Sequence, residues 1–159
     1  MVGCRYPVRL CDGPNVRWFK FTQTIGKAHY RMTTSFLFVY GTLRRSSMHP
    51  MALFLRNHSQ YLSDGQLPGR LYSLGRYPAM IYDAATENVV KGEVYELTDP
   101  VTVLAHLDAY EGIEGHSDDE YVRRCLPVET PKGPKSCWAY VFNLSPDGLS
   151  RVESGYWVE

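Results

Sequence analysis

The chain has 159 residues, of which 44% are hydrophobic, and this combination predicts one globular domain and argues against a disordered chain. Its 17 basic and 17 acidic side chains cancel, which argues against a protein that holds nucleic acid by bulk electrostatics. No apolar run approaches the roughly 18 to 20 residues that span a bilayer. The four cysteines contain no C-x-x-C pair, so neither a structural zinc site nor a disulfide scaffold is indicated. We therefore expect a cytoplasmic protein without a nucleic-acid or membrane partner.

The charge is unevenly distributed along the chain. Residues 1–31 contain six basic side chains and one acid, whereas residues 32–159 contain eleven basic and sixteen acidic side chains. The first segment has no apolar run of signal-peptide length, and it lacks serine, which disfavours a transit peptide. We predict a working domain over 32–159 and interpret 1–31 as a basic extension, either a disordered arm or a segment foreign to the native protein. A packed strand around 16–21 is the alternative.

The first predicted element of the domain is a strand over residues 35–40, an aromatic-rich apolar run typical of a strand buried on both faces. A helix is predicted over 49–58, with Pro50 in its first turn. Shorter strands follow, over residues 60–62, 69–74, 80–82 and 89–97. Turn residues separate these strands at Asp64-Gly65, Pro68-Gly69 and Asp83.

A second helix is predicted from the capping residue Asp99 to about Glu111, ending at Gly112. A hairpin over 120–128 and 135–143 follows, and Trp157 is expected to pack the tail onto the sheet. Many short strands with two helices that do not alternate regularly predict an α+β fold with a mixed or barrel-like sheet.

The second predicted helix breaks a local rule. Helical spacing from Leu104 places Leu107, Asp108 and Glu111 on the face that should meet the core. Both acids lie near the helix C-terminus, where the macrodipole disfavours negative charge by a few tenths to about 1 kcal/mol. Such an uncompensated feature is typical of functional sites, although a helix end that protrudes into water would also explain it.

A glycine directly after the first strand is the second unusual feature. A buried strand that runs into Gly41 leaves backbone N–H groups without partners, and glycine allows another molecule to approach the chain. Such a loop can bind a carboxylate or a developing oxyanion, although glycine after a strand is most often an ordinary turn.

Taken together, Tyr-Gly-Thr-Leu after the first strand and Leu-Asp-Ala-Tyr-Glu-Gly at 107–112 resemble the γ-glutamyl cyclotransferase-like family, nearest to its γ-glutamylamine cyclotransferase branch. The resemblance covers about residues 35–157. Four further stretches support it in the same order: Gly75-Arg76-Tyr77-Pro78-Ala79, Val90-Lys91-Gly92-Glu93-Val94-Tyr95, Tyr121-Val122-Arg123-Arg124 and Ser154-Gly155-Tyr156-Trp157.

The resemblance implies a small mixed β-barrel flanked by a few helices, and a cyclisation that needs neither a metal nor an organic cofactor. The α-amine of a γ-glutamyl group attacks its own γ-carbonyl, which releases 5-oxoproline and a free amine. Glu111 matches the catalytic glutamate, and burial that raises its pKa would make it a better base near neutral pH. The substrate-binding residues that the resemblance implies are Tyr40, Gly41, Thr42, Leu43 and Tyr121.

Several residues keep two interpretations. Tyr121 is either near the substrate or a half-buried strand residue, and Asp108 is assigned to hydrogen bonding rather than to catalysis. The acidic connector over 112–120 is interpreted as a solvated loop rather than a metal site; if it borders the entrance, its charge favours a cationic leaving amine. Arg44 and Arg45 are expected to be solvated, although they can meet a substrate carboxylate.

Cys125 and Cys137 lie on facing strands of the predicted hairpin, where we expect reduced thiols rather than a disulfide bridge.

The main alternative to the enzyme is a non-catalytic module that binds a small acid in the same cavity. An acid at position 111 favours the enzyme, because a carboxylate receptor gains nothing from it. A basic arm that tethers an inert domain is the third possibility. The sequence does not identify the leaving amine or the oligomeric state.

Overall fold

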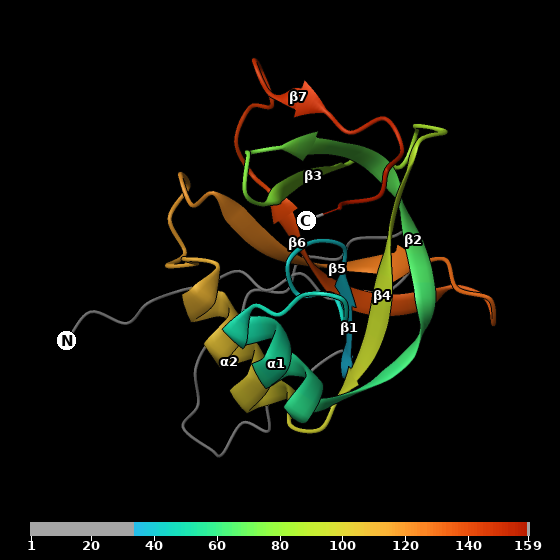
Figure 1. Ribbon diagram of the computed structural model, residues 1–159, viewed down its shortest axis with the longest axis vertical. Coiled ribbons are helices and arrows are strands. Elements are labelled where there is room, and N and C mark those ends of the chain that lie inside the picture. Colours follow the sequence, from blue (N-terminus) through green and yellow to red (C-terminus); the bar gives the residue numbers. More distant parts are fainter. Residues whose placement is uncertain (1–33, 159) are drawn as a thin grey trace, which may run out of the picture.

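The computed structural model describes residues 34–158, so the predicted basic extension lies outside the described residues. Within this range, seven strands and two helices follow one another along the chain (Figure 1). In order they are β1 (Phe36–Val39), α1 (Pro50–Asn57), β2 (Ser59–Ser73), β3 (Pro78–Tyr82), β4 (Val89–Leu97), α2 (Pro100–Tyr110), β5 (Tyr121–Val128), β6 (Lys135–Phe142) and β7 (Ser150–Arg151). Neither of the two helices in this part of the chain is long and apolar enough to cross a membrane.

The strands form one mixed sheet in the order β3-β2-β4-β1-β6-β5, with β7 paired to β2. β1 is antiparallel to β4 and parallel to β6, whereas the other described pairs are antiparallel. Gln66 of β2 and Glu129, just after β5, exchange two backbone hydrogen bonds of 2.9 Å. This bridge joins the two sides of the curled sheet, so the predicted α+β fold with a barrel-like mixed sheet is confirmed.

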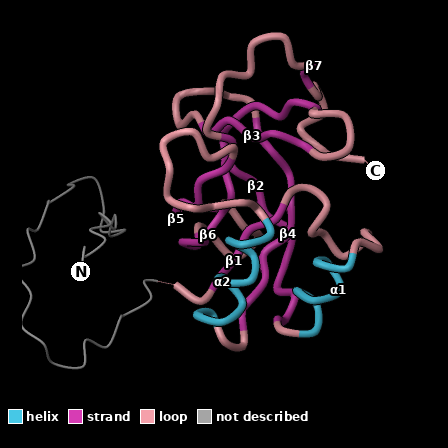
Figure 2. Tube along the Cα trace, turned by 90° about the vertical axis from the view of Figure 1, so that its left-hand side faces the viewer, coloured by secondary structure: helices cyan, strands magenta, loops and turns pink. Residues whose placement is uncertain are grey.

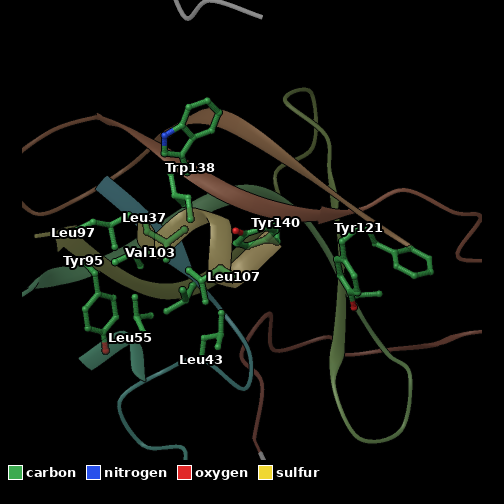
Figure 3. Packing of buried hydrophobic residues seen from close by; sticks show 14 residues of the cluster. Leu37, Leu43, Leu55, Tyr95, Leu97, Val103, Leu107, Tyr121, Trp138 and Tyr140 are labelled. Carbon is green, nitrogen blue, oxygen red and sulfur yellow. The ribbon is translucent and has the colours of Figure 1, made fainter. Parts of the chain in front are cut away.

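β1 is buried on both faces, as its apolar run predicted. Leu37 and Val39 belong to the cluster that packs against the helices, part of which Figure 3 shows. Phe38 and Tyr40 belong to a second cluster on the other face of the sheet. The helices α1 and α2 lie side by side in both views of the chain (Figures 1 and 2), with the rings of Phe54 and His106 5.1 Å apart. The end of β1 therefore has a position fixed by packing from two sides.

The prediction of two short strands within residues 60–74 is wrong, because β2 runs without interruption through both expected turns. It pairs with β4 along its first part and with β3 along its second part, with a bulge between Tyr61 and Ser63. Gly65 lies where β2 approaches the end of β5, and a Cβ added there would lie 2.7 Å from Val128 Cγ1. Glycine at this position allows the sheet to curl upon itself and does not form a turn.

α2 begins and ends as predicted. Asp99 caps its N-terminus by accepting a hydrogen bond from Thr102 N–H at 3.2 Å, and Pro100 occupies the first turn. Gly112 has a φ of +68°, and the N–H groups of Gly112 and Ile113 bond back to the carbonyls of Ala109 and Asp108. This Schellman motif leaves Glu111 as the C-cap residue, with its backbone fixed on both sides.

The hairpin of β5 and β6 is confirmed, and its register separates the two thiols. Cys125 pairs with Trp138 and Leu126 pairs with Cys137, so the two cysteines point to opposite faces of the sheet. Neither forms a disulfide, and burial raises the pKa of Cys137 to about 12. Trp157 is buried in the second core cluster, so the predicted packing of the tail is also confirmed.

Candidate active site

A cavity of about 420 Å³ opens beside the end of β1. It is bounded by the loop after β1, the start of β3, the C-terminus of α2, the connector that follows, the start of β5 and the middle of β6. The six residues predicted from the sequence all line it: Tyr40, Gly41, Thr42, Leu43, Glu111 and Tyr121. The structure therefore brings residues 40–43 together with Glu111 and Tyr121, which follow 68 to 81 positions later in the chain.

The loop after β1 contributes residues 41–43 to the cavity lining. Among the described residues, none accepts a hydrogen bond from the backbone N–H of Gly41, Thr42 or Leu43, while the Gly41 carbonyl accepts from Arg44 N–H at 3.1 Å. A Cβ added at Gly41 would lie 2.6 Å from Pro78 Cγ. The loop can thus offer N–H donors to an anion only while residue 41 has no side chain.

Three contacts hold the turn that continues from this loop. Buried Glu93 of β4 accepts hydrogen bonds from Arg45 N–H at 2.8 Å and from the Tyr95 hydroxyl at 2.7 Å. Arg56 of α1 donates to the carbonyls of Arg45 and Ser47 at 2.8 and 2.9 Å. Contacts from a strand and a helix therefore hold this turn, and the C-terminal tail supplies the third contact through Arg44.

The third contact corrects the expectation that Arg44 is solvated. Arg44 is only 3% exposed, and its guanidinium donates to the carbonyl of Trp157 and lies 4.2 Å from the ring centre of Tyr156. Residues 156 and 157 supply a carbonyl and an aromatic face that compensate the buried charge. Arg44 is thereby engaged with the tail and does not line the cavity.

Glu111 has the electrostatic properties of a base. Burial, followed by the nearby carboxylates of Glu120 and Asp108, raises its pKa to about 7. None of the ion pairs formed by residues 34–158 involves Glu111. The predicted effect of burial on this carboxyl is confirmed, and it places the pKa where proton transfer near neutral pH is most effective.

Asp108, one helical turn earlier, is in a different environment. Its carboxylate accepts two hydrogen bonds from Arg123, at 3.0 and 2.8 Å, and one from the Tyr140 hydroxyl at 2.8 Å. Arg123 in turn lies 4.9 Å from the ring centre of Trp138. The expectation that Asp108 serves hydrogen bonding is confirmed, since its oxygens are occupied by protein donors.

Two tyrosine hydroxyls line the cavity in fixed orientations. Tyr40 donates to the carbonyl of Tyr140 at 2.8 Å, and Tyr121 donates to the carbonyl of Pro78 at 2.9 Å. Burial is the largest cause that raises the pKa of both phenols far above the ordinary value. These hydroxyls stay protonated at neutral pH. The Tyr121 oxygen retains lone pairs that can accept a hydrogen bond from a bound ligand, whereas the Tyr40 oxygen already interacts with the backbone of Met80.

The connector between α2 and β5 is largely exposed, as predicted for a solvated loop, and internal hydrogen bonds also hold its backbone. Asp119 is buried, and one of its carboxylate oxygens accepts hydrogen bonds from the N–H groups of Glu114, Gly115 and His116 at 2.8 to 3.1 Å. The side chain of Asn143 donates to the carbonyls of Ser117 and Asp119. No group of three or more His, Cys, Asp or Glu within residues 34–158 is arranged to hold a metal ion.

Sequence reasoning missed several residues of the cavity wall. Tyr77 and Pro78 lie within a stretch that supports the family resemblance, but no pattern assigned them to the site. Glu120 was one of several acids in the connector, and Tyr140 had the appearance of an ordinary strand residue. Only the folded chain distinguishes these positions from their neighbours.

Comparison with known proteins gives consistent matches for this part of the chain. The model of a family described as γ-glutamyl cyclotransferase, AIG2-like, matches residues 37–159. The γ-glutamylcyclotransferase family protein YtfP of Escherichia coli K12 is 35% identical over 130 residues, which cover 77% of this chain and 96% of YtfP. The putative γ-glutamylcyclotransferase YkqA of Bacillus subtilis is 29% identical over 127 residues, and the match spans only 42% of that longer protein.

Solved structures agree with these sequence matches. The solution NMR structure of YtfP from Escherichia coli is 36% identical, with a TM-score of 0.54 over 78% of this chain and 96% of YtfP. The crystal structure of an AIG2-like protein from Mus musculus has a TM-score of 0.60 at 23% identity, over 75% of this chain and 86% of the mouse protein. At that identity the mouse structure supports the fold alone.

Proposed function

The chain belongs to the γ-glutamyl cyclotransferase, AIG2-like family, and from this premise we propose that it converts a γ-glutamyl amide into 5-oxoproline and a free amine, with Glu111 as the acid–base group. The observation that carries the proposal is the combination of two features in one cavity. A carboxyl with a pKa of about 7 and no ion-pair partner among the described residues lines the same cavity as a loop with unoccupied N–H donors.

The loop after β1 would bind the glutamyl end of the substrate. The α-carboxylate of the substrate would accept hydrogen bonds from the N–H groups of Gly41, Thr42 and Leu43, which have no acceptor among the described residues. Hydrogen bonds to a charged acceptor are roughly twice as strong as neutral ones. The Tyr121 hydroxyl can accept a further bond on the opposite wall.

Glu111 would then act as a base and as an acid in turn. It first removes a proton from the substrate α-ammonium, and the free amine attacks the γ-carbonyl carbon to form a tetrahedral intermediate. When the bond between this carbon and the leaving nitrogen breaks, the protonated Glu111 gives this proton to the departing amine. The second proton on the new ring nitrogen then passes through Glu111 to the released amine, which leaves the ring nitrogen of 5-oxoproline as a neutral amide N–H. The nucleophile belongs to the substrate, so the chain needs no covalent intermediate.

The experiment is release of 5-oxoproline from a panel of γ-glutamyl amides by the wild type and by Glu111→Gln. Removing the base should lower kcat/KM by roughly 10² to 10⁴-fold. Glu114→Gln, an exposed acid that does not line the cavity, is the matched control and should retain wild-type turnover. Turnover that survives Glu111→Gln would assign the base to another group.

The pH profile separates this base from an incidental carboxyl. Glu111 must be deprotonated to act, so kcat/KM should fall as the pH drops below about 7. No turnover of any amide, with 5-oxoproline bound equally by the wild type and Glu111→Gln, would indicate the non-catalytic binding module instead.

A further inference from the structure

We propose that Glu120, together with the rings of Tyr77 and Tyr110, forms a subsite at the mouth of the cavity for a positively charged group on the leaving amine, such as the second ammonium of a diamine or polyamine. The inference rests on the proposed function and specifies its substrate class. It concerns a residue that affects the proton transfer described above only through its charge, which helps to raise the pKa of Glu111.

The charge balance of the cavity is the first argument. Its wall contains two carboxylates, Glu111 and Glu120, and no lysine, arginine or histidine. Two arginines close to the cavity residues are already engaged, Arg44 by Trp157 and Arg123 by Asp108. The exposed Arg76, which precedes Tyr77, does not line the cavity. Any ligand that fills this cavity therefore meets two carboxylates and no cationic side chain in the wall.

The γ-glutamyl group, which all the proposed substrates share, supplies a positive charge for only one of the two carboxylates. A γ-glutamyl group carries one carboxylate, which the loop N–H groups would bind, and one ammonium, which faces Glu111. Glu120 is then left without a counter-charge, since no ion pair within residues 34–158 includes it. The remaining variable part of the substrate is the amine that leaves.

Two partly exposed aromatic side chains line the same cavity as this carboxylate. Tyr77 and Tyr110 line the cavity and are 40% and 39% exposed, which locates them at its mouth. Burial, followed by the adjacent Glu120 carboxylate, raises the pKa of Tyr77, so the phenol stays neutral beside the acid. An ammonium close to a carboxylate and to aromatic faces gains both ionic and cation–π attraction.

The backbone holds Glu120 in place before a ligand arrives. Its carbonyl accepts a hydrogen bond from Asn143 N–H at 2.8 Å, and the preceding Asp119 fixes the connector through three N–H groups. Tyr121, the next residue, begins β5 and lines the same cavity. A fixed carboxylate loses less freedom on binding than a mobile one, which favours selectivity.

The test compares two amides of the same shape, γ-glutamyl-1,4-diaminobutane and γ-glutamyl-pentylamine, in which a methyl group replaces the terminal ammonium. The wild type should turn over the diamine conjugate about tenfold more efficiently in kcat/KM at low salt, with the preference declining as salt is added. Glu120→Gln should abolish this preference, which is read as the ratio of kcat/KM for the two amides within each protein. Because Glu120 also helps to raise the pKa of Glu111, both proteins are compared above about pH 7, where Glu111 is ionised.

Asp118→Asn is the matched control, because it removes an exposed charge from the same connector without touching the cavity. It should keep the preference. Equal turnover of both amides by the wild type, a preference that survives Glu120→Gln, or an equal loss in Asp118→Asn would each overturn the subsite.

Calorimetric binding of the same two amides to Glu111→Gln, with and without Glu120→Gln, tests the subsite independently of catalysis. About tenfold tighter binding of the diamine conjugate, lost with Glu120→Gln, is expected even if the chain releases no 5-oxoproline. That result would retain the subsite while refuting the proposed reaction. Equal binding of the two amides would refute the subsite alone, and failure to bind either would refute both.

Discussion

The cavity has two ends that are built in opposite ways. The loop end, residues 41–43, offers main-chain N–H groups, and its continuation is held by Glu93, Arg56 and the contact of Arg44 with the tail. The carboxylate end, Glu111 and Glu120, offers side chains that no described cation neutralises. In the proposed function, recognition at the first end depends on the path of the backbone, whereas chemistry at the second depends on ionisable groups without an ion-pair partner. The loop end should therefore be sensitive to packing, and the carboxylate end to charge and pH.

The largest effect predicted from this comparison is a loss of activity when a side chain is added at the loop end of the cavity. In Gly41→Ala, the new Cβ would lie 2.6 Å from Pro78 Cγ, so the loop or Pro78 must move. A misplacement approaching 1 Å can cost about 10²-fold in rate, and we expect kcat/KM to fall by that order. Adding Pro78→Ala removes the clashing ring and should recover about tenfold. Wild-type kcat/KM in Gly41→Ala would show that the loop does not bind the substrate through its main chain.

A smaller effect, on stability, should follow from releasing the tail. Arg44→Ala removes a charged hydrogen bond to Trp157 and the stacking on Tyr156, and it should lower the free energy of unfolding by about 2–3 kcal/mol. Urea denaturation measures the change. Arg124→Ala, an exposed arginine on β5, should change stability by less than about 0.5 kcal/mol. Similar losses in the two variants would refute a specific contact between Arg44 and the tail.

The smallest effect concerns the pH dependence of stability at the carboxylate end. The pKa of Glu111 rises from 4.5 to about 7 on folding, so the native state binds more protons than the unfolded state between these values. Stability from this group is therefore lost as the pH rises from about 4.5 to 7. Glu111→Gln cannot ionise and should be about 1–2 kcal/mol more stable than the wild type at pH 8, with the difference vanishing near pH 4. Equal stability of the two proteins at pH 8 would contradict the raised pKa.

Local patterns predicted the elements that carry the two ends of the cavity. The apolar run of β1 and the cap and glycine of α2 reflect neighbours in the chain, and both elements end within one residue of the predicted place. β2 was misjudged because Gly65 and Pro68 are turn residues by local rules, whereas the approach of Val128 from a distant strand explains Gly65. Short-range rules cannot contain that information.

The same reasoning explains the errors at the site. Arg44 is buried by residues 156 and 157, which no local rule connects with it. Glu120 and Tyr140 differ from nearby acids and tyrosines only because the connector and β6 bring them to the end of β1. The anomaly at Glu111, an acid on an apolar helix face, is visible within one helix, whereas its catalytic role was implied by the family resemblance and stays a prediction.

The central place of β1 in the sheet has a consequence for how the protein refolds. This strand lies between β4 and β6, and Tyr40 at its end bonds a carbonyl 100 residues away. Closing a loop of this length costs chain entropy before the strand pairing can offset that cost, so the step is slow. The docking of β6 on β1 is therefore expected late in folding. Because that step also completes the cavity wall, a ligand of the cavity should slow unfolding without accelerating refolding.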